Sequence, residues 1–420
     1  MPETTKTLPV KGTKFGLFWM GQTVSQFGDR ISALALPLIA VVMLHAQAEQ
    51  TALLTALIWL PNLLSPVVGT WVDGQTHKRR LMILADVLRA LALLSLPVTY
   101  LTSHLAMGQL YVVGLLAGIG QMAFDVSYPS FFVTLIPRSS YVDANSKLST
   151  TRSMSFVAGP AIGGALIQAV SAPVAVALDA FSFLFSATVI GRIKADTPPA
   201  ADRKLPFRQR VVAGMAFIRR HSILRASLAC STTMNFFMFA AQALIILFAN
   251  TVLRLSAGEI GFALGIGAVG GLIGAVVARR VVNVVGLGRT IMLGAALYPS
   301  PLALLAVAHG SQWTNALALG GMEFLSGFGV MLFDIGNNSL RAAVTPDAMR
   351  SRTSGAYSAV NYGSRPLGAL VGGWLGTAIG LRPTLLTAAI LGAAGCLWLL
   401  LSPIPGLATV PESVNEPTAT

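Results

Sequence analysis

The chain has 420 residues, of which 54% are hydrophobic and only 11% are charged, and its formal net charge is +13. Soluble proteins carry about 25% charged residues, so the long uncharged runs of this chain predict membrane spans rather than a large soluble core. The basic residues fall in short loops between apolar runs, which is a membrane-topology pattern and argues against nucleic acid as a partner. We therefore expect an integral membrane protein in a lipid bilayer.

Twelve apolar runs each approach or exceed the ~20 residues that a helix needs to cross the hydrocarbon. In chain order they are Phe15–Leu44, Thr51–Val72, Leu81–Thr102, Met107–Leu135, Leu148–Val170, Pro173–Ile193, Ile223–Leu253, Glu259–Ala278, Leu287–His309, Trp313–Val344, Thr353–Ile379 and Pro383–Leu401. The sequence thus predicts an all-α protein with twelve transmembrane helices.

The loops differ in their content of Lys and Arg. The N-terminus and every loop that follows an even-numbered run hold almost all of them, whereas the alternate loops hold only Arg254 and Arg382. Because Lys and Arg are retained on the cytoplasmic side of a bilayer, we expect both termini in the cytoplasm and the chain in the cytoplasmic (inner) membrane.

A polar interval separates the sixth and seventh runs. Within it Val211, Met215 and Ile218 recur at helical spacing, with Arg219 and Arg220 on the other face. This pattern predicts an amphipathic helix at the inner membrane surface. The predicted domains are an N-terminal six-helix bundle, a cytoplasmic linker with this helix, a C-terminal six-helix bundle and a disordered cytoplasmic tail, over residues 1–194, 195–222, 223–402 and 403–420.

The two halves repeat. A shift of 209 residues superposes five pairs of residues without a gap, namely Asp125 on Asp334, Pro137 on Pro346, Gly159 on Gly368, Gly163 on Gly372 and Gly164 on Gly373. Self-similarity at nearly half the chain length predicts two parallel, pseudo-symmetric repeats.

The loop between the second and third runs contains a short motif. Gly69 is followed after three residues by Asp73, and then by the basic cluster Lys78, Arg79 and Arg80. The cluster alone is a topology signal. The whole motif resembles the signature between the second and third helices of major facilitator superfamily transporters, although a glycine replaces the arginine that usually follows the aspartate.

The resemblance extends over nearly the whole chain. The segments FGLFWMGQTVSQFGDRISALALPLIAV, LMILADVLRA, VAGPAIGGALI and VALDAFSFLFSA resemble the drug- and siderophore-exporting branch of the superfamily, which includes enterobactin-exporter-like proteins. The resemblance implies the major facilitator fold and a monomeric secondary active transporter that exports small amphipathic molecules by proton antiport with alternating access.

The resemblance also implies a cytoplasmic gate. Asp73 is expected to meet the start of the eleventh run, near Ser351–Ser354, where free backbone N–H groups favour an anion. Lys78, Arg79 and Arg80 are expected to meet acids on neighbouring spans.

Further ionisable residues are assigned to the gate by their positions in the apolar runs. Asp86 and Arg89 lie one helical turn apart and are expected to form a local ion pair. Asp125 and Asp334 occupy equivalent places in the repeat, and we expect them to support the gate as partners of loop cations. Asp179 lies in an apolar run and is expected to have a structural role.

Small residues recur four apart in the fifth and eleventh runs, where they allow helix backbones to approach closely. They are Gly159, Gly163, Gly164, Gly368, Gly372 and Gly373. Simple packing is the favoured interpretation, and sliding of the two helices during rocking of the halves is the functional alternative. The pattern in the fifth run also resembles the antiporter motif of exporting relatives.

Two carboxylates lie deepest in the spans and are candidates for proton coupling, Asp29 and, as the second choice, Glu323. The positions one turn from Asp29 hold no cation, being Ser25, Gln26, Ser32 and Ala33. We expect Asp29 to lack a partner, and burial then favours its protonated form; pairing with a cation from another span is the alternative. Arg30 points about 100° away around the helix and is a candidate for holding an anionic substrate group.

Aromatic and Met side chains on the first and seventh runs predict an adaptable apolar cavity. The candidates are Phe27, Met234, Phe236, Phe237, Met238 and Phe239, with Asn235 as a polar group. Contact with lipid or simple packing is the alternative for these side chains.

The sequence does not contain the motifs that would indicate an enzyme of the classes considered. The sequence contains neither a phosphate-binding G-x-x-x-x-G-K-[ST] loop nor H-E-x-x-H, and its two cysteines lie in apolar runs. We expect no enzyme, cofactor or metal; the partners are a small-molecule substrate and protons. A metabolite facilitator or importer of the same fold and a non-transporting membrane sensor or assembly partner are the alternative functions.

Overall fold

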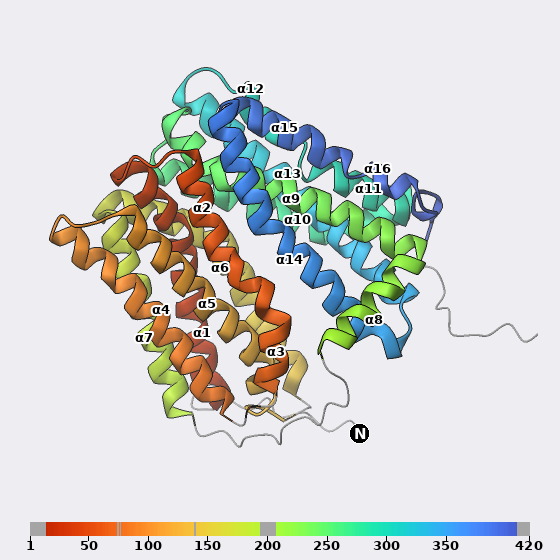
Figure 1. Ribbon diagram of the computed structural model, residues 1–420, viewed down its shortest axis with the longest axis horizontal. Helices are drawn as coiled ribbons and strands as arrows, with labels where there is room; N and C mark the ends of the chain where they lie inside the picture. Colours follow the sequence, from red (N-terminus) through yellow and green to blue (C-terminus); the bar gives the residue numbers. More distant parts are fainter. Residues whose placement is uncertain (1–13, 74, 76, 138–139, 194–206, 410–420) are drawn as a thin grey trace, which may run out of the picture.

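The computed structural model describes residues 14–73, 75, 77–137, 140–193 and 207–409, and Figure 1 shows its path. Throughout these ranges the regular structure is helical. The N-terminal helices are α1 (Lys14–Leu38), η1 (Ile39–Met43), α2 (Ala48–Trp59), η2 (Leu60–Leu64), α3 (Ser65–Asp73), α4 (Lys78–Leu101), α5 (Met107–Phe132), α6 (Tyr141–Val170) and α7 (Ala172–Arg192).

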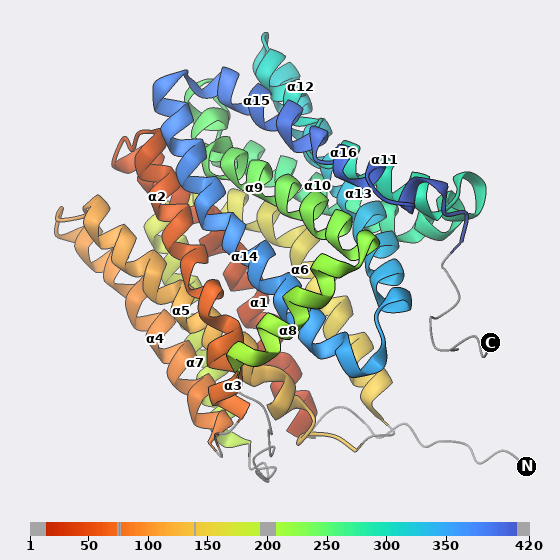
Figure 2. The ribbon, with the colours of Figure 1, turned by 45° about the vertical axis from the view of Figure 1, so that its right-hand side comes forward.

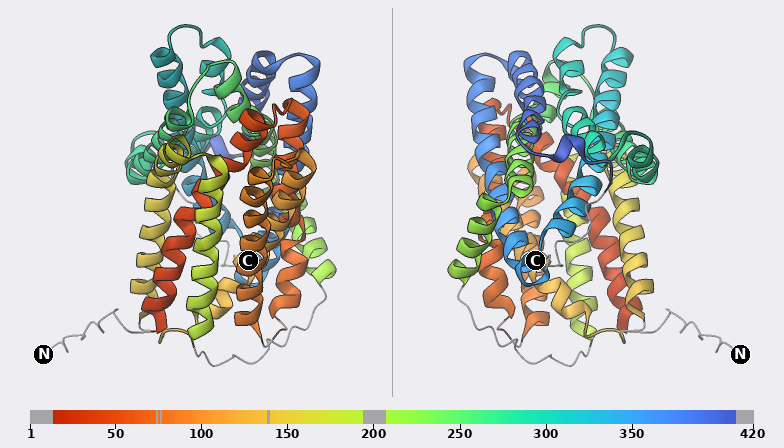
Figure 3. Two further views of the ribbon diagram at one scale, coloured as in Figure 1. Left: turned by 90° about the vertical axis from the view of Figure 1, so that its left-hand side faces the viewer. Right: turned by 90° about the vertical axis from the view of Figure 1, so that its right-hand side faces the viewer.

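After the linker helix α8 (Phe207–Arg220) come the C-terminal helices. They are α9 (Ser222–Thr251), α10 (Ala257–Val285), α11 (Leu287–Leu297), α12 (Leu302–Val307), α13 (Gln312–Val344), α14 (Asp347–Ala378), α15 (Leu381–Ala394), α16 (Leu397–Leu400) and η4 (Ile404–Gly406). In side views, the axes of most long helices are roughly aligned with one another (Figure 3).

Among the described residues, ten helical stretches are long and apolar enough to cross a membrane. The second predicted span is divided into α2, η2 and α3, because Pro61 lacks an N–H and interrupts the α-helical hydrogen bonds. The eleventh predicted span is α14, which carries Arg350, Arg352 and Arg365. It lies beside α2 and α9 (Figure 2). This arrangement is consistent with the twelve predicted helices.

Two of the long helices begin at serine caps. The Ser256 hydroxyl accepts the Glu259 backbone N–H, and the Glu259 carboxylate accepts the Ser256 N–H at 2.8 Å. The Ser311 hydroxyl accepts the N–H of Thr314 at 3.3 Å. Such caps satisfy backbone donors that have no partner within the helix, and they set where α10 and α13 begin.

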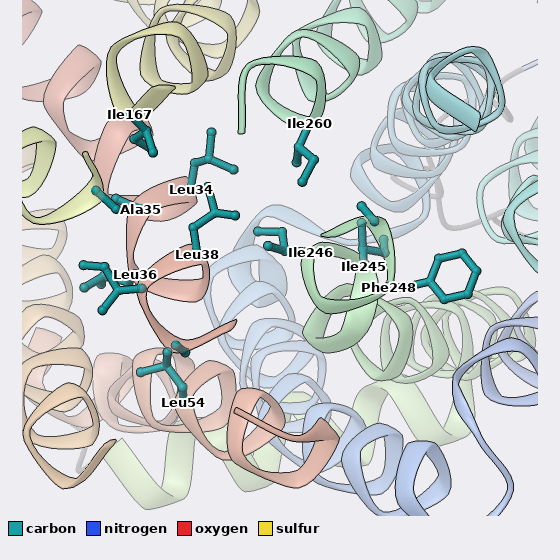
Figure 4. Close-up of a cluster of buried hydrophobic side chains, with 14 of the residues drawn as sticks. Leu34, Ala35, Leu36, Leu38, Leu54, Ile167, Ile245, Ile246, Phe248 and Ile260 are labelled. Carbon is teal, nitrogen blue, oxygen red and sulfur yellow. The ribbon is translucent and has the colours of Figure 1, made fainter. Parts of the chain in front are cut away.

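The ends of the bundle differ. We call the end where α4, α6, α11 and α14 begin the basic end, because the loops predicted to be cytoplasmic lie there. At the opposite end one hydrophobic cluster joins N-terminal and C-terminal helices (Figure 4). It includes Leu34 and Leu38 of α1, Ile245 and Ile246 of α9 and Ile260 of α10, each at most 7% exposed. The two sets of helices are thus packed together at that end.

At the basic end each set has its own hydrophobic cluster. One is formed by α1, α4, α5, α6 and α7 around Phe18 and Met82. The other is formed by α8, α9, α11, α13 and α14 around Leu224 and Leu340. The protein is therefore closed at the opposite end, while its two halves form separate cores at the basic end.

Glycines allow the closest helix crossings. A Cβ added to Gly163 would lie 3.2 Å from the Ile31 Cα on α1, and one added to Gly372 would lie 2.2 Å from the Ala240 oxygen on α9. These helices can approach this closely because the two positions lack side chains.

The neighbouring glycines face the other half. An added Cβ at Gly164 would lie 2.5 Å from the Ala257 oxygen on α10, and one at Gly373 would lie 2.3 Å from the Ala52 Cβ on α2. The two repeats therefore use equivalent glycines for equivalent crossings.

The linker helix α8 packs across α14 (Figure 2). Among its described side chains, Gly214 and Ile218 are the buried positions, and a Cβ at Gly214 would lie 2.2 Å from the Arg352 oxygen. The apolar face that predicts an amphipathic helix thus contacts protein, and α8 also reaches α3 of the N-terminal half. Its depth in the membrane stays a prediction.

Candidate functional site

A partly buried ion pair connects α1 and α4, with the side chains of Arg89 and Asp29 3% and 34% exposed. An Arg89 Nη donates a hydrogen bond to Asp29 Oδ1 at 2.5 Å, and the other Nη lies 3.8 Å from Asp86 Oδ1. Arg89 and Asp86 are 3% and 0% exposed, and the guanidinium stacks 3.6 Å from the Phe183 ring centroid. The expectation that Asp29 lacks a partner is wrong. Both α1 and α4 pack on α7, which brings together residues that a search along one helix does not compare.

Asp179 adds a second carboxylate beside this pair. Its side chain is 1% exposed and accepts hydrogen bonds from the hydroxyls of Ser32 on α1 and Ser182, the latter at 3.0 Å. A Cβ at Gly28 would lie 2.1 Å from Asp179 Oδ1, so a glycine is required for this approach. From the sequence we expected a structural role for Asp179. An aspartate within an apolar run also indicates a functional site, and this signal could have placed Asp179 among the candidates.

A pocket of about 300 Å³ opens beside these residues, and we call it the carboxylate pocket. Its charged lining residues are Asp29, Arg30, Arg89, Asp125 and Asp179. Two guanidinium groups, those of Arg89 and Arg30, therefore lie among three carboxyl groups, and Arg89 is the one bonded to Asp29. This arrangement allows the positive charge to change partners when one carboxyl group gains a proton.

We expected Asp125 and Asp334 to be partners of loop cations, but neither forms an ion pair among the described residues. Gln121 donates to Asp125 Oδ2 at 2.9 Å, and Asp125 faces the carboxylate pocket. Asp334 lines a larger cavity in the middle of the protein. Both residues lie away from the ends of their helices and line internal spaces.

Of the predicted gate cations, Arg79 binds backbone carbonyl groups. Arg79 donates from Nε to the Ile190 oxygen at 2.9 Å and from Nη2 to the Gly191 oxygen, at the end of α7. A cation at a helix C-terminus satisfies its free carbonyls, which explains why Arg79 binds backbone where we expected an acid. Lys78 is buried at the start of α4 and Arg80 is exposed. The side chain of Asp73 lies outside the described residues.

The larger space, which we call the central cavity, has a volume of about 830 Å³ and lies between the two halves. Of the predicted cavity residues, those that line it are Arg30, Met234, Asn235, Met238 and Phe239. Phe236 points elsewhere: its ring lies 5.2 Å from that of Phe237 and its backbone meets α14 at Gly368. Phe27 is half-buried outside the lining.

A hydrogen-bond network forms part of the cavity wall in the C-terminal half. The Tyr357 hydroxyl donates to Ser231 Oγ at 2.6 Å and accepts from Asn337 Nδ2 at 3.0 Å, and Ser227 donates to Asn337 Oδ1 at 2.5 Å. These four side chains come from three helices, and sequence reasoning missed them. Their amide and hydroxyl groups give this wall both donors and acceptors for a polar ligand.

Aromatic rings hold three arginines that line the same cavity, Arg341 and Arg365 from the C-terminal half and Arg30 from the N-terminal half. The Arg365 guanidinium carbon lies 4.5 Å from the Trp59 centroid and 4.9 Å from that of Phe239. Arg341 stacks on Tyr357, and Arg30 stacks on Phe156.

Glu323, the second candidate for proton coupling, lies elsewhere. It faces α10, where a Cβ at Gly267 would be 2.9 Å from its Oε2, and it lines neither the carboxylate pocket nor the central cavity.

The carboxylate pocket and the central cavity share Arg30, Ala33, Ile58 and Trp59 in their walls. Two repeated helical halves with a polar cavity between them are the architecture of many secondary transporters, including those of the major facilitator superfamily. The chain belongs to the transmembrane secretion effector family of that superfamily, whose family model matches residues 4–418. Its members are transporters rather than enzymes.

Curated relatives are similar at low identity over most of their length. The multidrug efflux pump Tap of Mycolicibacterium fortuitum is 24% identical over 379 residues, which cover 86% of this chain and 88% of that protein. Macrolide efflux protein A of Streptococcus pyogenes is 24% identical over 270 residues, covering 62% of this chain and 65% of that protein.

Solved structures of other transporters share the fold. The nucleoside transporter NupG superposes with a TM-score of 0.69 at 12% identity, over 92% of this chain and 98% of that chain. A bacterial homologue of the iron transporter ferroportin in an inward-facing state has a TM-score of 0.69 at 19% identity, over 92% and 98% of the two chains. At these identities the likeness concerns the fold alone.

Proposed function

We propose that this protein exports small amphipathic molecules, such as drugs, antibiotics or siderophore-like compounds, in exchange for protons. The observation that carries the proposal is the wall shared by the carboxylate pocket and the central cavity. A proton bound in the pocket and a molecule bound in the cavity would contact the same residues, among them Arg30 and Trp59. The names of the relatives, a multidrug efflux pump and a macrolide efflux protein, support the direction of transport.

Asp29 is the proposed proton-coupling residue. When Asp29 is ionised, it holds Arg89 and thereby fixes α1 against α4. Protonation of Asp29 would remove that attraction, and Arg89 would turn toward Asp86, whose carboxylate already lies 3.8 Å away. Each proton that enters the cell contributes about 2.3 kcal/mol per 100 mV of membrane potential.

The two halves are proposed to rock around the cavity as units, residues 1–194 against residues 223–402. The structure joins the halves at the opposite end and has separate cores at the basic end. If the basic end is cytoplasmic, as the loop cations predict, this is the state that loads substrate from the cell interior. Asp73 and the loop cations would gate that side, in a monomer of the cytoplasmic membrane.

Cysteine labelling tests the orientation. In a Cys396→Ser background, cysteine at Gln75 should resist an impermeant thiol reagent added to intact cells, because its loop is cytoplasmic. Cysteine at Gln47 or at Ser311, both exposed at the opposite end, should react. Labelling at Gln75 without labelling at the other two positions would reverse the proposed orientation.

Transport is tested in two steps. A growth-inhibition panel in an efflux-deficient host first identifies a compound against which the native protein protects. That compound is then added to inside-out vesicles with an acidified lumen, where antiport predicts that the lumen becomes more alkaline. Uptake without proton movement would favour a facilitator or importer, and specific binding without flux would favour a sensor or assembly partner.

A further inference from the structure

The central cavity carries an excess of positive charge. Three arginines line it, Arg30, Arg341 and Arg365, whereas Asp334 is the only carboxylate among its lining residues. The other polar groups of the wall are neutral amides and hydroxyls. An uncompensated charge in a membrane protein is costly, so groups of this kind normally face a partner or a water-filled space.

Each of these arginines is held by an aromatic ring. The guanidinium carbon of Arg30 lies 4.4 Å from the Phe156 centroid, and that of Arg341 lies 3.5 Å from the Tyr357 centroid. Arg365 lies between several rings, including Tyr362 at 4.6 Å. Stacking fixes the plane of a guanidinium and leaves its edge of N–H donors available, which is the geometry that binds an oxyanion with two hydrogen bonds.

The donors of these arginines are incompletely used. In the part of the chain that the structure describes, the Nε groups of Arg30, Arg341 and Arg365 are buried without a hydrogen-bond partner. Arg341 makes one long bond from Nη1 to Asn338 at 3.4 Å. The ion pairs among the described residues involve none of the three. A buried donor without a partner is unfavourable, and a ligand oxygen would remove that cost.

Two of the stacked pairs occupy equivalent places in the repeat. The arginine of one pair is at the position of the phenylalanine in the other. The shift of 209 residues relates Arg30 to Phe239 and Phe156 to Arg365. Arg30 stacks on Phe156 between α1 and α6, and Arg365 stacks near Phe239 between α14 and α9. Each half thus supplies one guanidinium and one ring to the cavity, so the cavity presents a basic group from both walls.

We propose that the exported molecule is an amphipathic anion, in which a carboxylate, phosphate or sulfonate is attached to an apolar or aromatic body. Arg30 and Arg365 bind the anionic group, and the body contacts the apolar wall formed by Trp59, Met234 and Met238. This inference rests on the proposed export function and specifies its substrate class. An inside-negative membrane potential also drives an anion outward, in the direction of export.

The test uses two dyes that share a xanthene body and differ in charge, the anion fluorescein and the cation rhodamine 123. Binding to the purified full-length protein in lipid nanodiscs is followed by fluorescence polarisation. We expect fluorescein to bind at least tenfold more tightly than rhodamine 123. Arg30→Gln and Arg365→Gln should each weaken fluorescein binding by about tenfold or more, because a hydrogen bond to a charged group contributes roughly 1.5–3 kcal/mol.

Two variants separate charge from other effects. Arg289→Gln removes an exposed cation outside the cavity and should leave fluorescein binding unchanged. Arg365→Lys keeps the charge but loses the planar fork, and it should bind fluorescein with an affinity between those of the native protein and Arg365→Gln. The thermal unfolding of each variant in nanodiscs shows whether it is folded.

The outcomes distinguish this inference from the export proposal. If rhodamine 123 binds more tightly than fluorescein, or if neither dye binds, the anionic substrate class is wrong. Unchanged fluorescein binding in folded Arg30→Gln and Arg365→Gln would also overturn it. In each of these cases compound-dependent proton movement in vesicles would still support export, and only its absence together with absent growth protection would overturn the export proposal.

Discussion

The two halves of this transporter repeat their helices and one aspartate, Asp125 and Asp334, but not the charge cluster around Arg89. Under the shift of 209 residues the start of α2 falls on the start of α10, and the start of α4 falls on the start of α11. The charged residues of the cluster, Asp29, Asp86, Arg89 and Asp179, fall on Met238, Ala295, Tyr298 and Ala388. The C-terminal half therefore builds the same helical framework without this cluster. Because charges in a bilayer cost at least roughly 2.5–3.5 kcal/mol each, the comparison indicates that the N-terminal cluster exists for function.

Packing, in contrast, is repeated. Gly163 and Gly372 bring α6 and α14 against α1 and α9 of their own halves. Gly164 and Gly373 bring the same two helices against the other half. The contacts that set how helices cross are thus the same in both halves, whereas the polar and charged groups differ between them. The buried ion cluster lies in one half, and the hydroxyl and amide network lies in the other.

The largest expected effect comes from removing the charge that is unique to the N-terminal half. Asp29→Asn should abolish proton-driven accumulation in inside-out vesicles while leaving downhill substrate exchange largely intact. The variant cannot exchange a proton at this position, and Arg89 loses its 2.5 Å partner. The measurement is uptake of the protected compound with and without a proton gradient.

Glu323→Gln is the matched control for this experiment, because it removes a membrane carboxylate that lines neither the pocket nor the cavity. It should pump normally. If Asp29→Asn pumps normally and Glu323→Gln does not, proton coupling belongs to the C-terminal half. If both variants pump normally, the coupling carboxylate is another residue, and Asp179 is the next to test.

The close approach that accommodates the cluster should be sensitive to a single methyl group. Gly28→Ala would place a Cβ 2.1 Å from Asp179 Oδ1 and 2.5 Å from Ser182 Oγ. Overpacking of this kind costs typically about 1–3 kcal/mol, and it should also reduce proton-driven uptake by displacing Asp179. Thermal unfolding in detergent and vesicle uptake measure the two effects.

Gly321→Ala is the control for that variant. It adds the same methyl group within a C-terminal helix, at a position where nothing lies within 4 Å of the new Cβ. It should unfold at the native temperature or slightly above, since alanine favours helix over glycine. Equal stability of the two variants would contradict the tight approach of α1 to α7.

Sequence reasoning predicted features that depend on one helix at a time. The apolar runs, their ends and the 209-residue shift follow from patterns along the chain, and the helices α4, α5 and α13 begin within a few residues of the prediction. Contacts between helices were harder to predict. Arg89 is 60 residues from Asp29, and only the packing of α1 and α4 on α7 brings them together.

Helix rotation explains the remaining differences at the site. Neighbouring residues on a helix point about 100° apart, so an aromatic cluster on α9 cannot all face one cavity. Met234 and Asn235 face it and Phe236 does not. The surroundings of Arg365 come from α2, α9 and α14, and no sequence pattern connects those three segments. The roles of the predicted gate and coupling residues stay predictions.

A smaller effect should follow from disturbing the polar network of the C-terminal half. Tyr357→Phe removes the hydroxyl that accepts from Asn337 and donates to Ser231. A buried donor left unsatisfied costs about 1–3 kcal/mol, so the protein should unfold at a lower temperature. Tyr362→Phe, one turn further along α14, removes a hydroxyl with no hydrogen bond among the described residues and should unfold near the native temperature. The reverse order would contradict the network.

The smallest expected effect concerns the contact between the start of α4 and the end of α7, which we call the corner of the N-terminal half. The C-terminal half makes a different contact at the equivalent position. In the N-terminal half Arg79 donates to the last carbonyls of α7, at Ile190 and Gly191. At the equivalent position, Gly288 donates its backbone N–H to the Leu407 oxygen at 2.9 Å. Arg79→Gln should lower stability by only about 0.3–1 kcal/mol, because a partly exposed cation at a helix end contributes little.

Arg80→Gln is the matched variant for this corner, since it removes an exposed cation from the adjacent position. It changes the charge of the loop by the same amount, so it should affect topology equally and stability less. Thermal unfolding of the two proteins at low and high salt compares them, and the difference should shrink as salt screens the Arg79 contact. If the two variants unfold at the same temperature in low salt, Arg79 does not stabilise the end of α7, and the corner of the N-terminal half is held by packing alone.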